Sequence, residues 1–416
     1  MATSIDFNSF LNNSQKFLQT DLGIINLFWP PLAALILVLI ADLLIQQIFV
    51  PNLLKLKVNI ELTQIQKSLG IPLLLNLSKL VLFTTSLIGA GVGTKLGING
   101  GISQKEAFFN YGLTGFITSL SILLIYVIYK TRNVETTSNQ YPNTVRDLFF
   151  LFLGVVVLAI ATGDRDLNLV DALAMLLYSA FYIVITQNWQ TILEKINEIL
   201  KTNWQATPIS QIHEIQMELY KSKTDEFNQT KLNREFNKFF DKSELIGTTK
   251  TVFIGLTTTT LAILSYNFAF RNLLFWFDNI RKYTPNIDYT ILAGLIIAIP
   301  LAFNNISYYN YLLKTKNNLV ASSFSFIQAF FGVLFSISLG ATLLILQNGG
   351  YRIALRSVTQ YQIWYSLFII TLTLALFALS FQNRLNIKNW KFISLGLALV
   401  GIGIIVLQIL FLKGLR

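Results

Sequence analysis

The amino-acid sequence predicts an all-α integral membrane protein with about ten transmembrane helices, arranged as two inverted five-helix repeats with a central cytoplasmic helical loop. Of the 416 residues, 53% are hydrophobic and only 13% are charged, which is about half the charged fraction of a soluble domain. Apolar runs of about 20 residues, enough to cross a hydrocarbon core about 30 Å thick, recur along the whole chain. A weak internal repeat predicts the division into two halves.

Each predicted span is an apolar run with polar residues at its ends. The spans cover residues 27–49, 70–94, 108–129, 148–163, 171–188, 250–270, 288–312, 322–347, 362–382 and 393–413. They divide the chain into an N-terminal interfacial segment at 1–26, a first five-helix repeat at 27–188, a cytoplasmic helical loop at 189–249 and a second five-helix repeat at 250–413.

Lysine and arginine give the chain a net charge of +11. Nucleic-acid binding is one source of such a charge, but membrane proteins concentrate these residues in their cytoplasmic loops, and we favour topology as the origin. The loops between successive spans alternate between two sides, and the positive excess lies on the side that carries the loop at 189–249. That side is therefore predicted to be cytoplasmic, with both termini outside.

The loop at 189–249 contains two runs of apolar residues at helical spacing. The first run is Ile192, Ile196, Ile199 and Leu200, and the second is Ile212, Ile215 and Leu219. Polar residues occupy the other faces, so we expect an amphipathic helical hairpin that rests on the cytoplasmic face of the membrane. A regulatory domain is the alternative, although nothing in the loop marks a ligand site.

The residue types exclude several kinds of site. The chain has no cysteine and one histidine, His213, which argues against a disulfide, a thiolate metal site or a multi-histidine metal site. No nucleophile–base pair and no paired acids occur within the predicted spans, so an intramembrane enzyme is poorly supported. We predict no metal centre and no cofactor.

Two stretches of sequence close the two predicted halves in a similar way. Each consists of a span, a short polar turn with an arginine and the pattern Leu-Asn-Leu or Leu-Asn-Ile, and a second span; the copies run over 151–187 and 367–408. Because each half has an odd number of spans, the second copy enters the membrane in the opposite direction. An inverted repeat places a substrate site near the midplane, between the halves.

With these features the chain resembles the calcium/cation antiporter superfamily, which includes the sodium/calcium exchangers. Arg146-Asp147-Leu148 opens a span that is followed by a short turn, Asp171 and Tyr178-x-x-x-Tyr182, and Ile40-Ala41-Asp42-Leu43-Leu44 lies in the first span. The resemblance implies a cytoplasmic loop between two five-helix halves and an outside N-terminus. It also implies cation transport through the second and third spans of each half, where the family has A-x-G-T-S-x-P-E and G-N-x-x-G-S-N motifs.

The sequence departs from both acidic motifs. Asn305 takes the glutamate position in the second half, after Ala298-Ile299-Pro300, and Gly89 takes it in the first half, after Thr85 and Ser86. The resemblance then implies a substrate- or ion-binding set in which neutral oxygens replace the carboxylates: Asn305, Asn304, Gln328, Ser323, Thr85, Ser86 and Asn110. Small hydroxyl residues in spans also serve helix packing, so packing is the alternative for the serines and threonines.

The missing carboxylates bear on the choice of ion. Ca²⁺ takes six to eight oxygens, several of them normally charged. Without a carboxylate at the midplane, two positive charges would stay uncompensated in a medium of low dielectric constant. Ca²⁺ exchange through the usual site is therefore disfavoured, whereas neutral oxygens can hold a monovalent cation.

Two ionisable residues lie inside predicted spans, Asp42 and Lys79. Such residues are rare and often functional. Asp42 either titrates with protons or pairs with Lys79, or else bonds to neighbouring helices in a structural role. Lys79 either acts as a fixed cation or proton switch, or extends from a position near the cytoplasmic end of its span to the interface.

Two functions remain in competition. The first is a divergent exchanger-like secondary transporter of a monovalent cation or a proton, with an uncharged solute as a further substrate class. The second is a transport-inactive membrane scaffold that keeps the fold and binds membrane-protein partners. A polar cavity between the halves favours the transporter, whereas Phe303, Phe326 and Phe330 filling that space favour the scaffold. The expected partners are the lipid bilayer, a small cation and membrane proteins, and no nucleic acid.

Overall fold

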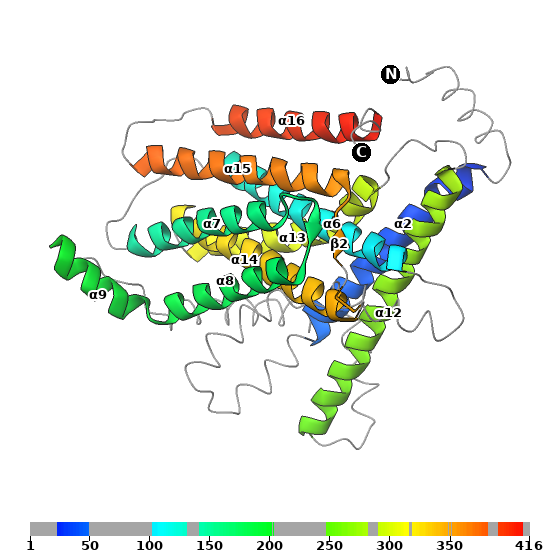
Figure 1. The fold of residues 1–416 in the computed structure, drawn as a ribbon, viewed down its shortest axis with the longest axis horizontal. Helices are drawn as coiled ribbons and strands as arrows, with labels where there is room; N and C mark the ends of the chain where they lie inside the picture. The colour runs from blue at the N-terminus through cyan, green and yellow to red at the C-terminus, as the bar shows by residue number, and fades with distance from the viewer. Residues whose placement is uncertain are drawn as a thin grey trace.

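The computed structural model describes residues 23–49, 102–130, 141–201, 203, 247–281, 290–315, 318–347, 349–350, 352–381 and 390–410. These residues form an all-helical membrane protein with one very short pair of strands (Figure 1). The elements are α2 Gly23–Leu43, the π-helix η1 Leu44–Phe49, α6 Ile102–Lys130, α7 Tyr141–Ala161, β1 Asp166–Leu167, α8 Leu169–Gln187, α9 Trp189–Leu200, α12 Gly247–Arg281, α13 Thr290–Thr315, α14 Asn318–Gln347, β2 Ile353–Ala354, α15 Ser357–Phe381 and α16 Trp390–Leu410.

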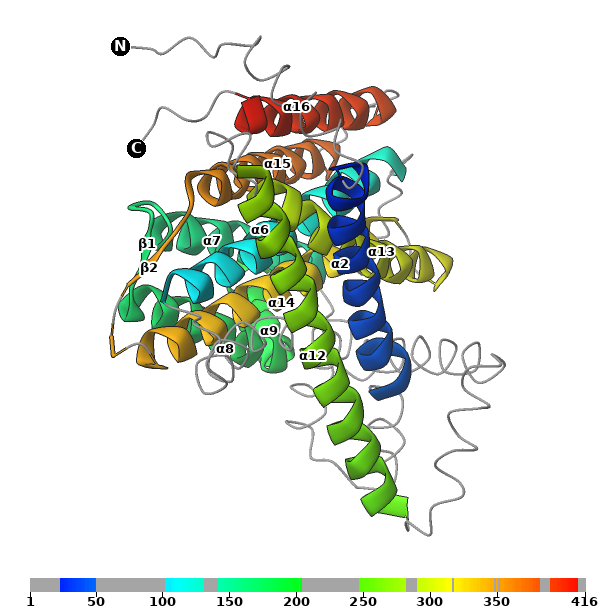
Figure 2. The ribbon, with the colours of Figure 1, turned by 90° about the vertical axis from the view of Figure 1, so that its right-hand side faces the viewer.

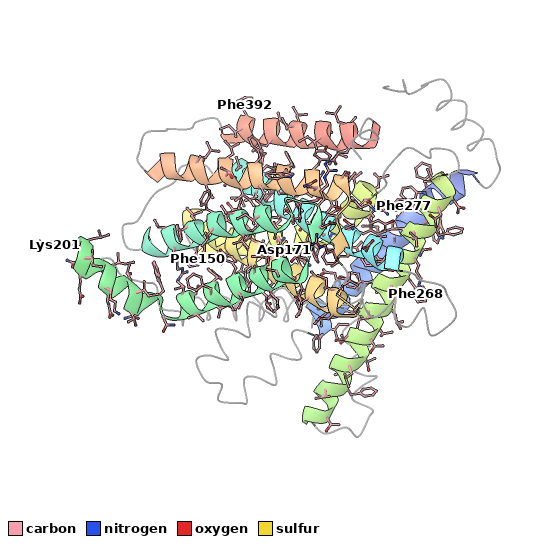
Figure 3. The ribbon with its side chains drawn as sticks, viewed as in Figure 1. Phe150, Asp171, Lys201, Phe268, Phe277 and Phe392 are labelled. Atoms are coloured by element: carbon pink, nitrogen blue, oxygen red, sulfur yellow. The ribbon has the colours of Figure 1, made fainter. Side chains whose placement is uncertain are left out.

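Six helices of the described part are long and apolar enough to cross a bilayer. Each of them lies on a predicted span: Phe28–Gln46, Glu106–Lys130, Leu169–Thr186, Val252–Ile280, Thr290–Lys314 and Ala329–Leu346. Helices α7, α15 and α16 cover the predicted spans at 148–163, 362–382 and 393–413. The predicted span at 70–94 lies outside the described residues. Large apolar side chains such as Phe268 and Phe392 are exposed on the outside of the bundle, as a hydrocarbon solvent requires (Figure 3).

Helices α2 and α12 lie side by side along one flank of the bundle in both ribbon views (Figures 1 and 2). Phe49, at the end of η1, fills the space beside Gly255 near the start of α12, where a Cβ atom would come within 2.6 Å of the phenyl ring. The end of the first segment therefore meets the beginning of the second, and the two helices are antiparallel.

Helix α6 runs through the middle of the bundle and packs against α13, α14, α15 and α16. Its contact with α13 is unusually close. A Cβ atom on Gly115 would lie 2.6 Å from Ile297 Cγ2, and one on Gly294 would lie 2.5 Å from Thr114 Cγ2. Glycine permits this approach because small residues let two helix backbones come near each other in a membrane.

Hydroxyl pairs join α6 to α15 at a constant spacing. The Thr114 and Thr359 hydroxyl oxygens lie 2.9 Å apart, and those of Ser121 and Ser366 lie 2.6 Å apart. In both pairs the partners are 245 positions apart in the sequence. The two helices are therefore parallel and in register over about two turns. These bonds connect the predicted first half to the predicted second half.

The turn between α7 and α8 pairs with the segment that precedes α15. Asp166 lies opposite Ala354, and Leu167 opposite Ile353, in the antiparallel pair β1–β2. The Leu355 amide also donates to the carbonyl oxygen of Arg165 at 2.7 Å, and Arg165 has the left-handed φ of 68°. This end of the bundle, where α6 and α15 begin and α7 ends, is called the β end below.

The first predicted helix of the loop at 189–249 is present as α9. Leu193 is its buried residue, whereas Ile199 and Leu200 are exposed. Trp189, which opens α9, stacks under the guanidinium of Arg146, 5.3 Å from the ring centroid. The predicted second helix around Ile212 to Leu219, and almost all of the predicted interfacial segment at 1–26, lie outside the described residues. The inverted relation of the two halves stays a prediction.

Candidate cation site

The structure places Asp42 of α2 against Asn304 of α13. The Asn304 Nδ2 group donates a hydrogen bond of 2.6 Å to Asp42 Oδ2. The Asp42 side chain is buried, with 8% of the residue exposed. The two residues are 262 positions apart and belong to different predicted halves. The contact therefore brings a carboxylate and an amide, both singled out in the sequence, to one place within the membrane-spanning helices.

Helix α12 supplies a third polar residue to this region. Tyr266 is buried, and its hydroxyl group lies within electrostatic range of the Asp42 carboxylate. Sequence analysis did not single out Tyr266. A tyrosine in an apolar span is an ordinary core residue by pattern, and only the packing of α12 along α2 brings it near an acid.

Both helices depart from regular geometry close to the pair. Directly after Leu43 the chain passes into the π-helix η1, a rare conformation that is frequent at functional sites. On α13, Pro300 precedes Asn304 by one turn. Because proline has no N–H group, the carbonyl of Ile296 loses its helical donor there. Both departures therefore lie within about two turns of the hydrogen-bonded pair.

Asn305 follows Asn304 and faces the neighbouring sector of α13, because successive helix residues are turned by about 100°. Its Nδ2 atom is buried and has no hydrogen-bond partner among the described residues. A buried amide that lacks a partner costs about 1–3 kcal/mol. Since the oxygen and nitrogen of an amide side chain can exchange places by a flip, Asn305 can offer a bound ligand either a donor or an acceptor.

Asn110 lies in a different part of the molecule. Its Nδ2 donates to the carbonyl oxygens of Glu106 and Ala354 at 2.8 and 3.0 Å, and its Oδ1 accepts from the Arg356 amide and the Thr359 hydroxyl at 2.9 and 3.0 Å. All four positions of the amide are used by protein groups at the β end, where they hold the start of α15 against α6.

The register of α6 against α13 gives the distance between Asn110 and Asn304 along the helix axis. Gly115 lies opposite Gly294, so Asn110 is level with the beginning of α13, and Asn304 is about 20 Å further along the helix axis. The predicted grouping of Asn110 with Asn304 and Asn305 is therefore not seen in this structure.

The remaining candidates cannot be placed in the site. Gln328 and Ser323 belong to α14, but their side chains lie outside the described part of the structure. Thr85, Ser86 and Lys79 lie outside the described residues altogether. Of the three phenylalanines expected to fill a central space, Phe330 is buried beside Gly154, Phe303 is 68% exposed, and the side chain of Phe326 is not described.

A buried ion pair lies on α7. The Arg146 Nε and Nη2 groups both donate to Asp147 Oδ1, at 2.9 and 2.7 Å, and both residues are at most 5% exposed. This pair is electrically neutral and also contacts Trp189. The cation–π contact of Arg146 with Trp189 connects α7 to α9.

No group of three or more histidine, cysteine or acidic side chains that could hold a metal ion occurs within the described residues. Among the described residues, the site therefore consists of the Asp42 carboxylate and the Asn304 amide, with Asn305 next to Asn304 on α13 and Tyr266 on the adjoining helix α12. Such a set can take up a proton, or can surround a weakly bound cation with one charged and several neutral oxygens.

Comparisons with known proteins give a likeness of fold. No family model matches the chain. No curated protein sequence matches it either. Among solved structures, the chain is similar to one titled "Crystal Structure of H+/Ca2+ Exchanger CAX", with 12% sequence identity, a TM-score of 0.49, and coverage of 96% of this chain and 92% of that chain. A similarity of this degree does not show that this chain binds what that protein binds.

Proposed function

We propose that this chain is a secondary transporter that moves a monovalent cation or a proton across the membrane, with Asp42 and Asn304 at its charge centre. The observation that carries the proposal is the buried hydrogen bond of 2.6 Å between Asp42 of α2 and Asn304 of α13. Intramembrane acids are costly, and in transport proteins they mark ion pathways and proton relays.

The negative charge of the Asp42 carboxylate favours a monovalent cation or a proton over Ca²⁺ as the substrate. A single carboxylate balances one positive charge, which suits a proton or a monovalent cation. Ca²⁺ would leave one positive charge uncompensated among neutral amides and hydroxyls, at a large cost in a medium of low dielectric constant. The proposed transporter therefore differs in substrate from the calcium exchangers that its sequence resembles.

The location of the pair suits alternating exposure to the two sides. Asp42 lies on the α2–α12 flank and Asn304 on α13, which packs closely on the central helix α6. A small displacement of α2 relative to α13 would break the hydrogen bond and change the access of water to the carboxylate. Pro300 and η1 provide the local backbone freedom for such a displacement.

The test is ion flux in proteoliposomes, with Na⁺, K⁺, H⁺ and Ca²⁺ gradients compared for the wild type and for Asp42→Asn. We expect flux of a monovalent cation or of protons in the wild type and a loss of at least tenfold in the variant, because the neutral amide removes the balancing charge. Asp278→Asn, which changes an exposed acid on α12, is the matched control and should retain flux.

Asn305→Ala should lower the apparent affinity for the transported ion, whereas Asn310→Ala should not. Asn310 is an amide on the same helix, but its Oδ1 accepts from the Tyr126 hydroxyl at 3.1 Å. Absence of flux for all four ions in folded wild-type protein would contradict the proposal, as would full flux in Asp42→Asn.

A transport-inactive scaffold is the second candidate, and one observation favours it. The α6–α13 contact leaves no room for a Cβ atom at Gly115 or Gly294, and α6 is bonded to α15 at two levels. A tightly locked centre suits a protein that presents a fixed surface to membrane-protein partners. The same flux experiment separates the two functions, since a scaffold predicts no flux of any ion.

A further inference from the structure

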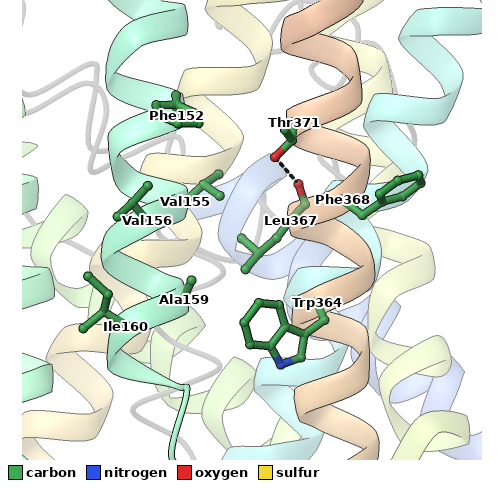
Figure 4. Close-up of a pocket in the computed structure, with 9 residues that line it drawn as sticks. All are labelled: Phe152, Val155, Val156, Ala159, Ile160, Trp364, Leu367, Phe368 and Thr371. Atoms are coloured by element: carbon green, nitrogen blue, oxygen red, sulfur yellow. Dashed lines mark hydrogen bonds between the residues drawn. The ribbon is translucent and has the colours of Figure 1, made fainter.

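A groove of about 530 Å³ runs along the lipid-facing side of the bundle between α7 and α15. Phe152, Ala159 and Ile160 line it from α7, and Trp364, Phe368 and Thr371 line it from α15 (Figure 4). The two walls come from different predicted halves. Ile160, Phe368 and Trp364 are 76%, 56% and 49% exposed, so the rim is open to the surrounding hydrocarbon.

The groove offers no polar group that a ligand must satisfy. Its one hydroxyl, that of Thr371, already donates to the carbonyl oxygen of Leu367 at 2.8 Å, as Figure 4 shows. All the other lining side chains are hydrocarbon or aromatic, apart from the indole N–H of Trp364 at the edge. The chemistry therefore selects an apolar ligand.

The length of the groove matches one leaflet. From Phe152 to Ile160 the α7 wall extends over eight residue steps, or about 12 Å at 1.5 Å per residue. Half of a hydrocarbon core is about 15 Å thick. Ile160 is next to the last residue of α7, and Trp364 is two turns into α15. The groove consequently belongs to the leaflet at the β end.

The β end adds two features that suit a phospholipid. Trp364 lies toward the interface, where the amphipathic indole is favoured. The residue just before β2 is the exposed Arg352, and the turn between α7 and α8 carries Arg165 between Asp164 and Asp166. The charge of Arg352 at this end and the hydrocarbon along the groove are complementary to a phosphate and an acyl chain.

From these observations we propose that the groove binds one acyl chain of a phospholipid from the leaflet at the β end, with the phosphate directed toward Arg352. Burial from water gives no advantage to a ligand that already lies in hydrocarbon. The acyl chain is retained by dispersion contacts with the side chains of α7 and α15. The bound chain fills the space between α7 and α15 and thereby supports the contact of the two halves at their lipid face.

The test uses the full chain in vesicles with a trace of phospholipid that carries a photoactivatable diazirine in its acyl chain, followed by peptide mass spectrometry. We expect the label to concentrate on 152–160 and 364–371, at least fivefold above the face of α8 that carries Leu177 and Phe181. Those two residues are also highly exposed, at 70% and 51%, but do not line this groove, so they report the level of labelling outside it.

Ala159→Phe fills the groove and should reduce labelling there at least fivefold, whereas Ala180→Phe on the exposed face of α8 should not.

Arg352→Gln leaves the groove intact and should remove the preference of the label for an anionic over a zwitterionic phospholipid. Equal labelling of the groove and α8, or labelling that survives Ala159→Phe in a monodisperse protein, would each overturn the proposal. An unchanged headgroup preference in Arg352→Gln would overturn the assignment of the phosphate.

Discussion

Asn110 and Asn304 are the same residue type in apolar spans, yet their contacts give them different tasks. The Asn110 amide has four protein partners, so replacing it leaves several backbone groups without a bond. Asn304 has a carboxylate as its partner, and the pair can exchange that bond for a proton or an ion. At the residue scale, the number and charge of the partners distinguish the structural amide of Asn110 from the amide that we propose takes part in transport.

Asn110→Ala should destabilise the protein by about 2–4 kcal/mol, because the Arg356 amide and the Ala354 carbonyl lose their partner inside the bundle. The measurement is the free energy of unfolding in mixed micelles. Asn188→Ala, which removes an exposed amide bonded only to the carbonyl of Val184, should cost less than about 0.5 kcal/mol. Equal effects of the two substitutions would contradict the role given to Asn110.

The Arg146–Asp147 pair yields a prediction of the same kind. Arg146→Ala leaves a carboxylate buried beside Tyr182 without its cation and should cost about 3–5 kcal/mol, whereas replacing both charges by Met and Leu should recover most of that loss. Unfolding of the two variants, with Glu194→Gln on the exposed face of α9 as the control, checks this. A double variant no more stable than the single one would be evidence against a purely structural pair.

At the scale of elements, α6 is the helix around which the others are ordered. Glycine at 115 allows α13 to approach, and hydroxyl groups at 114 and 121 set the register of α15. These contacts lie on different faces of one helix, so α6 determines both the distance to one neighbour and the axial position of the other. Its sequence is accordingly rich in small and hydroxyl residues where a lipid-facing helix has large apolar ones.

Gly115→Ala and Gly403→Ala form a matched pair of substitutions within helices. The first places a Cβ atom 2.6 Å from Ile297 Cγ2, whereas the second meets no atom within 4 Å. We expect Gly115→Ala to destabilise the protein by about 1–3 kcal/mol through overpacking. Gly403→Ala should be neutral or stabilising by up to about 1 kcal/mol, since alanine favours the helix. Thermal unfolding in detergent distinguishes the two, and similar shifts for both would refute the close α6–α13 contact.

At the scale of the whole molecule, bonds that cross between the predicted halves hold the bundle together. The α6–α15 pairs, the β1–β2 pair and the Asp42–Asn304 bond each join residues on opposite sides of the loop at 189–249. The two halves therefore interdigitate, and neither is a separate globular unit. A site at their junction responds to any movement of one half against the other.

The absence of cysteine from the chain makes this arrangement directly testable. Ser121→Cys with Ser366→Cys replaces two hydroxyl groups whose oxygens lie 2.6 Å apart, which is within reach of a disulfide. After oxidation and cleavage at a protease site engineered into the central loop, the two fragments should stay joined on a denaturing gel. Ser121→Cys with Thr371→Cys, whose second residue is exposed at the groove, should leave them separate.

The sequence by itself determined the membrane class, the positions of the spans that fall within the described residues, and the polar residues in them. These are local properties: the length of an apolar run and the presence of Asp42, Asn304 or Asn110 in it can be read without knowing its neighbours. Motif spacing could not determine which of these residues meet, because it orders residues along the chain and carries no information about the axial register of one helix on another.

Only the tertiary structure decided the partners. Asp42 and Asn304 are 262 positions apart, and their contact depends on how α2 crosses α13. Asn110 was grouped with the amides of α13 by resemblance, but the Gly115–Gly294 contact fixes a register that places it about 20 Å away along the helix axis. The β1–β2 pair had no signal in the sequence, because two residues in each strand are too few for any periodicity. Packing between distant segments, which minimises voids and unsatisfied polar groups, made these choices.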